Sequence, residues 1–150
     1  MRLEYLVGWE ELREDAKIIA IDPGKTTGIA IGYWKPGMKS EEGVEEAFEM
    51  TGLGVLSWLH NQWWDRLVVE DFILPPHAGA LTKDATETIK MVGAIQAMFD
   101  RVQMVPPSQH KSVITEERLD AAGWWIEGEP HARDAVRILL FALRNLAAHK

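Results

Sequence analysis

Three carboxylates stand at places where they could together carry metal-dependent chemistry. Asp22 closes the apolar run IIAID, Glu70 closes LVVE, and Asp134 lies within HARDAVRILL near the end of the chain. Oxygen ligands of this kind suit hard divalent cations such as Mg²⁺ or Mn²⁺. Two such ions roughly 3.5–4 Å apart can activate a water and stabilise the leaving oxygen in phosphodiester hydrolysis. The three residues therefore indicate a metal-dependent hydrolase.

Each carboxylate also has a purely structural interpretation. An acid that follows a strand often forms a turn, caps a helix or remains a solvated charge. Asp22 stands apart because it leads into IDPGKTTG, a tight glycine-rich turn. Asp71 competes with Glu70 for the role on the second acidic strand. Because adjacent side chains of a strand point to opposite faces, only one of the two can join Asp22, and we prefer Glu70.

The last helical segment carries a second set of candidate residues. At about 100° per residue its apolar side chains fill one broad arc, which we expect to face the core. That arc contains Ala132, Ala135, Val136, Leu139, Leu140, Leu143, Leu146 and Ala147. His131 and Asp134, at i and i+3, share another arc, so His131 could bind metal or donate a proton. The alternative for His131 is a local hydrogen bond at the start of the helix. Arg133, Arg137 and Arg144 gather on a third arc, as DNA contacts or as an ordinary solvated face.

The elements that must position these residues follow from periodicity and turn residues. Apolar runs predict strands over 17–22, 28–33, 44–50, 66–72 and 102–105. Helical spacing predicts helices over 3–15, 53–64 and 81–99. Further helices are expected after Ser108 as a cap, before Gly123 as a terminator, and from Pro130 onward. Residues 35–43 and 74–79 are predicted to be loops.

The order β-β-β-α-β-α-β-α predicts an α/β protein with a five-stranded mixed sheet and helices on both faces. The first and fourth strands can then lie side by side, which would bring Asp22 and Glu70 to one edge of the sheet. A helix that crosses this edge would add Asp134. No linker or repeat divides the 150 residues, so we expect a single domain.

Bulk composition limits the function classes. Sixteen Lys and Arg against 23 Asp and Glu leave a net charge of −7, the wrong sign for binding nucleic acid through overall charge. DNA binding would need a local basic surface, to which Lys83, Lys90 and Lys111 could contribute, or metal ions in an acidic site. No apolar run approaches the roughly 18 residues of a membrane span. The absence of cysteine and of a signal peptide pattern is compatible with the cytoplasm.

Four segments together resemble the RuvC-type Holliday junction resolvases of the RNase H-like nuclease superfamily. IIAIDPGKTTGIAI is similar to the family's first hairpin, and LVVED to its second acidic strand. PPSQHKSVI is similar to the segment after the fifth strand, and HARDAVRILL to the last helix. The four segments span about residues 17–147, which leaves residues 1–16 as an N-terminal extension. His131 stands where the family often has an aspartate.

The resemblance implies an RNase H-like endodeoxyribonuclease that cuts branched DNA such as Holliday junctions with two Mg²⁺ or Mn²⁺ ions per site. It assigns Asp22, Glu70, His131 and Asp134 to the metal site and Lys111 to a DNA or phosphate contact. It also implies a homodimer, because a four-way junction has two symmetric strands to cut. The Trp-bearing segments and the helix over 81–99 are the candidate interface. A bacterial or phage origin is expected, with the protein in the bacterial or host cytoplasm.

Other functions stay open at this point. IDPGKTTG also matches the phosphate loop of actin-like and sugar-kinase nucleotide binders, but that fold needs a second similar domain, for which 150 residues leave no room. A related nuclease that acts on RNA or on an RNA–DNA hybrid would share the metal site. A non-catalytic DNA-binding homologue is disfavoured by the intact set of Asp22, Glu70 and Asp134.

Overall fold

A five-stranded sheet in the order β3-β2-β1-β4-β5 forms the centre of the protein. The computed structural model describes residues 15–73, 79 and 81–149. The antiparallel part of the sheet consists of β1 (Ala16–Asp22), β2 (Thr26–Trp34) and β3 (Val44–Thr51). The parallel part, added beside β1, consists of β4 (Arg66–Glu70) and β5 (Val102–Val105). The predicted mixed sheet is confirmed, and β1 and β4 are neighbours as expected.

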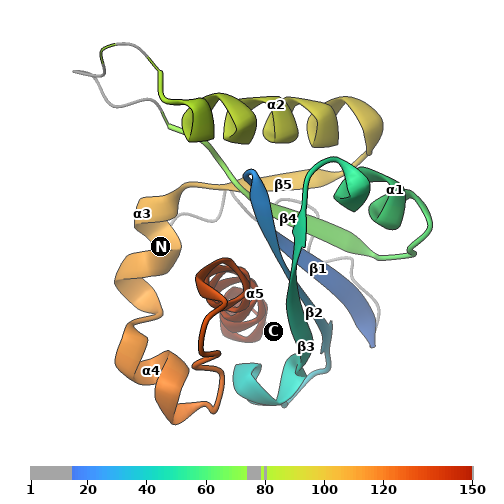
Figure 1. The fold of residues 1–150 in the computed structure, drawn as a ribbon. Helices are drawn as coiled ribbons and strands as arrows, with labels where there is room; N and C mark the ends of the chain where they lie inside the picture. The colour runs from blue at the N-terminus through green and yellow to red at the C-terminus, as the bar shows by residue number, and fades with distance from the viewer. Residues whose placement is uncertain (1–14, 74–78, 80, 150) are drawn as a thin grey trace.

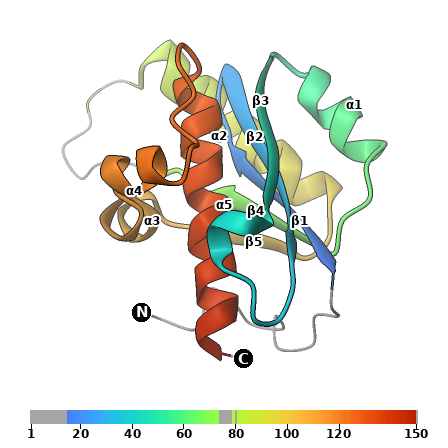
Figure 2. The same ribbon diagram turned by 90° about the horizontal axis from the view of Figure 1, so that it is seen from below.

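Helices cover both faces of this sheet (Figure 1, Figure 2). One face carries α1 (Gly54–His60) and α2 (Lys83–Met98). The other carries α5 (Pro130–His149), α3 (Pro107–Val113) and α4 (Glu116–Ala121). In both views α5 lies between the sheet and the pair α3–α4. Because α5 is covered from two sides, its buried surface is broader than the predicted arc and also includes Ile138, Phe141 and Ala142.

Each face of the sheet has its own apolar cluster. Alternation divides β1 between them: Ile18 and Ala20 face α5, whereas Ile19 and Ile21 face α1 and α2. All four side chains are buried, as expected for a strand with helices on both faces. Continuing the alternation by one residue places Asp22 on the α5 face.

Two glycines of β2 allow the backbone of the sheet to touch α5. A Cβ atom on Gly28 would lie 1.8 Å from the carbonyl oxygen of His131, and one on Gly32 would lie 2.9 Å from the side chain of Leu139. A side chain at Gly28 would meet the backbone of α5 and push the helix away from the sheet, whereas one at Gly32 would first meet the backbone oxygen of Gly43, at 2.6 Å. The absence of a side chain at Gly28 therefore sets how closely the first turn of α5 approaches β2.

Two predicted helix boundaries are wrong. The helix predicted over 53–64 ends at His60, because the chain must turn there to enter β4, and Trp63 is 54% exposed. Ser108 does not cap α3: Pro106 occupies the N-cap position and Pro107 begins the helix. Proline is favoured at that first helical position because its missing N–H would have no partner there.

The remaining differences are smaller. A short 3-10 helix, Ser40–Gly43, interrupts the predicted loop over 35–43. β4 ends at Glu70, two residues earlier than predicted. The predicted helix over 3–15 and most of the loop over 74–79 lie outside the described residues. Within the part of the chain that the structure describes, none of the helices has both the length and the apolar character to cross a membrane.

Candidate active site

The edge of the sheet where β1 and β4 end carries a row of residues from four strands. Glu49 of β3 lies opposite Gly28 of β2, and Gly28 lies opposite Asp22 of β1. The parallel pairing of β1 with β4 continues the row to Glu70. Asp71 lies just beyond, where its N–H donates to the carbonyl of Val105 in β5. Asp22 and Glu70 are therefore side by side on the face covered by α5.

The first turn of α5 begins directly over this row. Oε1 of Glu49 accepts hydrogen bonds from the backbone N–H of His131 at 3.1 Å and of Ala132 at 3.4 Å. A negative charge is favourable there because the N-terminus of a helix carries a partial positive charge. The backbone of His131 rests on Gly28, and its imidazole Nδ1 lies 3.1 Å from Oδ2 of Asp22. Contacts with β3 and β2 thus place the side chain of His131 against Asp22 of β1.

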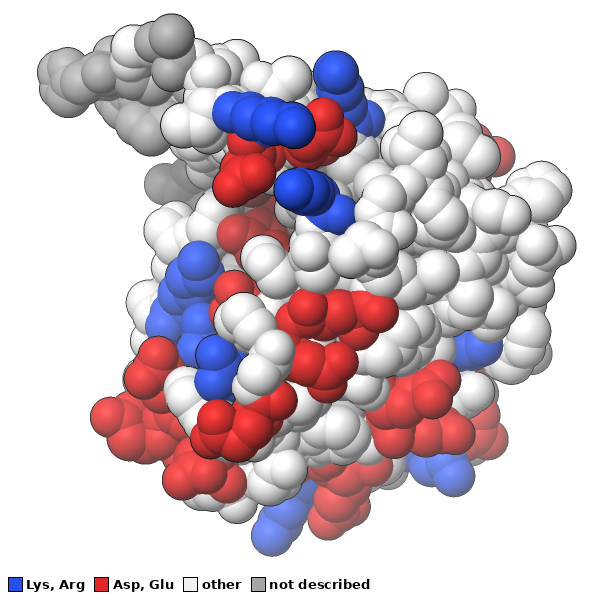
Figure 3. All heavy atoms as spheres, viewed as in Figure 1, with Lys and Arg blue, Asp and Glu red and all other residues white. Residues whose placement is uncertain are grey.

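A pocket of about 540 Å³ opens over the row. All four residues predicted for the metal site line it: Asp22, Glu70, His131 and Asp134. The other charged residues in its wall are Lys25, Asp71, Asp84 and Lys111. On the face shown in Figure 3, acidic side chains lie in the hollow below α2, with basic side chains over α2 and along α3. The pocket is therefore acidic at its base and has cations at its rim.

The carboxyl group of Asp22 carries an electrostatic penalty. Its side chain is only 13% exposed. Burial raises the pKa of Asp22 from 3.8 to about 7, and the charges of Glu70 and Asp134 add to the rise, although the hydrogen bond with His131 opposes it. The same hydrogen bond raises the pKa of His131 above its usual value. The contact with His131 therefore offsets only part of the effect that burial and the negative charges of Glu70 and Asp134 have on the pKa of Asp22.

Glu70 experiences the opposite net effect. Burial alone would raise the pKa of its carboxyl, but the contact with His110 and the charge of Lys111 bring that pKa below the usual 4.5. Both partners come from α3, which begins soon after β5. Glu70 is therefore held as a carboxylate next to Asp22.

The side chains in the pocket are of the chemical type that binds a divalent cation, but they do not converge on a single point. Asp22 and Glu70 offer carboxylate oxygens side by side, and a hard cation there would relieve the charge that raises the pKa of Asp22. Asp134, in contrast, accepts a hydrogen bond from Arg137 at 3.1 Å. Among the described residues, no three His, Asp or Glu side chains converge closely enough to hold a metal ion. Arg137 engages Oδ1 of Asp134, so a third ligand from α5 would come from the other carboxylate oxygen, Oδ2.

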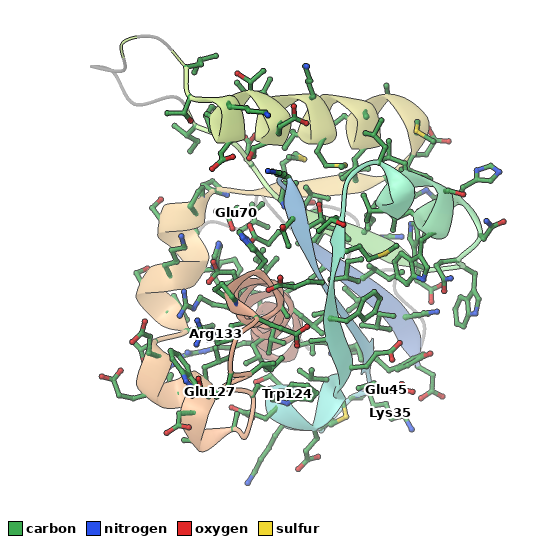
Figure 4. The ribbon with its side chains drawn as sticks, in the orientation of Figure 1. Lys35, Glu45, Glu70, Trp124, Glu127 and Arg133 are labelled. Atoms are coloured by element: carbon green, nitrogen blue, oxygen red, sulfur yellow. The ribbon has the colours of Figure 1, made fainter. Side chains whose placement is uncertain are left out.

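Two of the predicted DNA-binding arginines are already engaged within the protein. Arg137 forms the ion pair with Asp134 and is 11% exposed. The guanidinium of Arg133 lies 4.0 Å from the ring centre of Trp125. Figure 4 shows Arg133 towards α4, well apart from Glu70. Neither side chain lines the pocket.

The other predicted cations differ in position. Lys111 lines the pocket, as expected for a phosphate contact. Arg144 lies in a different hollow with Lys39 and Arg118, near the other end of α5. Lys83 and Lys90 are exposed on α2 and do not belong to the pocket wall. The structure therefore brings only one of the six predicted cations, Lys111, to the pocket.

Three residues near the pocket were not singled out by the sequence. Lys25 follows Asp22 in the motif DPGK, so the sequence could have placed this lysine near the carboxylate of Asp22. Glu49 is one of several acids in VEEAFEM and looks like an ordinary solvated charge. His110 is a lone histidine on a short helix, and nothing in its neighbours marks it as a partner of Glu70.

Solved structures share this fold. The structure of Thermus thermophilus RuvC in complex with a Holliday junction substrate matches with a TM-score of 0.64 and 18% identity, over 89% of this chain and 96% of that chain. A second Thermus thermophilus RuvC structure matches with a TM-score of 0.53 and 16% identity, over 89% and 95%. No protein-family model matches the chain, and no curated protein matches it significantly. The chain therefore has the RuvC-type resolvase fold, of the RNase H-like class, which confirms the fold expected from the sequence.

Proposed function

We propose that the protein is a divalent-metal-dependent endonuclease that cuts branched DNA. The observation that carries this proposal is the placement of Asp22 beside Glu70 at one sheet edge, with His131 against Asp22 in the same pocket. The fold supports the substrate class, because it is shared with Thermus thermophilus RuvC, which is known in complex with a Holliday junction substrate. The buried, partly uncompensated charge of Asp22 supports the metal.

In this proposal the side chains divide the work. Asp22 and Glu70 would hold Mg²⁺ or Mn²⁺, joined by Asp134 through the carboxylate oxygen that Arg137 does not engage. Bound ions supply an activated water and stabilise the leaving oxygen. His131, which is 44% exposed in the pocket wall, either serves as a further ligand or protonates the leaving 3′ oxygen. Products with 5′-phosphate and 3′-hydroxyl ends are expected.

DNA affinity is proposed to come from cations at the pocket rim rather than from overall charge, which is −7. Lys111 on α3 and Lys25 in the β1–β2 turn flank the carboxylates and would contact phosphates on either side of the scissile bond. A homodimer would present two such sites to the two symmetric strands of a four-way junction. The proposed location is the cytoplasm.

The test is a cleavage panel under single-turnover conditions. A four-way junction, a linear duplex, an RNA–DNA hybrid and an RNA of the same sequence are each incubated with Mg²⁺, with Mn²⁺ and with EDTA. We expect cleavage only with metal and fastest on the junction. Full cleavage in EDTA would contradict the metal mechanism, and preferred cleavage of the hybrid would favour the RNA-directed alternative. Tight junction binding without cleavage in either metal would indicate a non-catalytic homologue.

A further inference from the structure

His110 places two nitrogen atoms inside the protein next to the candidate active site. Its side chain is 0% exposed, and its Nε2 lies 3.3 Å from Oε2 of Glu70. The following turn of chain contributes Ile114 to the apolar cluster around α5. Figure 4 shows Glu70 where β4 ends, close to α3. The imidazole therefore approaches Glu70 from the interior and not from the pocket.

Among the residues that the structure describes, the buried polar atoms at this contact have no other hydrogen-bond partner. Within the described part of the chain, neither nitrogen of His110 nor Oε2 of Glu70 has an aligned hydrogen bond. Buried polar groups are nearly always hydrogen-bonded, because an unpaired group loses water without gaining a partner. An aliphatic side chain of similar size would avoid that penalty. The Glu70 carboxylate, 3.3 Å away, is the group here with which the imidazole of His110 can interact and an aliphatic side chain cannot.

We propose that His110 is a positioning residue for Glu70. Its Nε2–H donates to Oε2 of the Glu70 carboxylate, so that the other oxygen of this carboxylate is directed to a divalent cation in the pocket. The inference rests on the proposed metal-dependent function. A small rotation of the Glu70 carboxylate would align the contact. Carboxylates that bind metals are commonly held by such outer hydrogen bonds, which limit the rotation of the ligand.

His110 acts through Glu70 and does not touch the substrate. The pocket wall includes Lys111, the next residue of α3, but not His110. His131 is the opposite case, since it lines the pocket and contacts Asp22 at 3.1 Å. The two carboxylates are thus each approached by one histidine, from the interior and from the pocket respectively. Only the histidine in the pocket can take part in chemistry.

The test is the Mn²⁺ affinity of the whole protein without nucleic acid, measured by titration calorimetry and by electron paramagnetic resonance. His110→Leu keeps the volume and removes the donor, so affinity should fall about 10–100-fold while the melting temperature stays the same or rises. His110→Gln carries an amide N–H near the position of Nε2 and should retain most of the affinity. His110→Asn carries its amide near the position of Nδ1 and should resemble His110→Leu. Ile114→Val, a packing change on the same part of the chain, should leave affinity unchanged.

The outcomes separate this inference from the proposed function. Wild-type Mn²⁺ affinity in His110→Leu, with or without a lowered melting temperature, would overturn the positioning role. If circular dichroism shows that His110→Leu does not fold, the amide pair decides: tighter binding by Gln than by Asn supports the inference, and equal binding overturns it. Failure of the wild type to bind Mn²⁺ would overturn the proposed metal site and this inference with it.

Discussion

The two halves of α5 meet the sheet in different ways. At the first turn the backbone of His131 lies on Gly28 and donates to Glu49, and the side chains of His131 and Asp134 stay partly exposed. From Ile138 to Leu143 every side chain is buried. The second half therefore holds the helix through apolar area, whereas the first half adds one close backbone contact and two hydrogen bonds to the burial of Ala132, Ala135 and Val136.

This difference separates stability from chemistry along a single helix. Apolar burial is non-directional and tolerates small shifts, so the second half fixes where α5 lies but not how its first turn is oriented. The polar half determines the distance from His131 to Asp22 of β1, whose buried carboxylate disfavours folding near neutral pH. Substitutions at the polar end should therefore affect activity more than stability.

The largest expected effect is the loss of cleavage in Asp22→Asn. The substitution keeps the volume and removes the charge that a divalent cation requires, so single-turnover cleavage of a four-way junction should be abolished. Junction binding should be retained or improved, because a negative charge near the phosphates is lost. A variant that cleaves at the wild-type rate would remove Asp22 from the metal site.

The next effect concerns His131. General acid–base groups typically contribute about 10²–10⁴-fold, and His131→Ala should lose activity on that order while keeping its fold. His131→Asp should recover part of the rate if the role is metal ligation. It should recover little if the role is proton donation, because an aspartate beside a metal stays ionised. Rates near the wild type for His131→Ala across pH and Mg²⁺ concentration would leave the residue only a local structural role.

Gly28→Ala tests the close contact that orients the polar end. Its Cβ would lie 1.8 Å from the carbonyl oxygen of His131, so the first turn of α5 must move. Displacements of about 1 Å can reduce catalysis about 10²-fold, and overpacking costs about 1–3 kcal/mol. The matched control is Gly93→Ala in α2, where a Cβ meets nothing within 4 Å; it should keep activity and gain roughly 0.5–1 kcal/mol of stability. Equal activity of the two variants would contradict the role given to the contact.

A smaller effect should distinguish cations at the two ends of α5. Each phosphate contact contributes about −0.9 to the slope of log K against log salt on duplex DNA. Lys111→Ala should therefore flatten the slope by about one unit. Arg144→Ala, near the other end of the helix, should leave the slope unchanged. Identical slopes for Lys111→Ala and the wild type would place the DNA path elsewhere.

The smallest effect is a shift in melting temperature without metal. Because the pKa of Asp22 is raised from 3.8 to about 7, the folded protein binds more protons than the unfolded chain between these values. The free energy of unfolding therefore falls as pH rises through this window. In EDTA, Asp22→Asn should melt above the wild type at mildly alkaline pH and at the same temperature in acid. A change of one kcal/mol in the free energy of unfolding corresponds to roughly 2–4 °C in melting temperature for a protein of this size, which scanning calorimetry resolves. If the melting temperatures of Asp22→Asn and the wild type differ by the same amount at every pH, the role given to the buried charge is contradicted.

The sheet and its paired carboxylates could be predicted because local patterns determine them. Continuous apolar runs ending in acids marked β1 and β4, and the alternation of side chains meant that only one of Glu70 and Asp71 could join Asp22. The engagement of Arg137 could also have been anticipated, because it follows Asp134 at i+3 on a helix. The strands and the arginine contact needed only neighbours within one element or one hairpin, whereas the pairing of Asp22 with Glu70 came from the expected order of elements, which places β1 beside β4.

What could not be predicted depends on contacts between distant elements. Glu49 meets the N-terminus of α5 across 82 residues of sequence, and its own surroundings in the sequence are acidic and uninformative. The burial of Ile138 and Phe141 requires α3 and α4 to cover α5, which periodicity along α5 alone does not reveal. The separation of Arg144 from the pocket follows from the direction in which α5 runs over the sheet.

The contact between Asp22 and His131 joins residues 109 positions apart. Contacts of such long range close large loops and tend to form late in folding. A chain still being synthesised can pair β1 with β2 long before α5 exists, and it holds Asp22 without the histidine that meets it. Since N-terminal parts emerge first and can fold as they emerge, a growing chain carries an incomplete pocket until α5 has been made. Cleavage competence should therefore arise in a single step, with the docking of α5 on the sheet.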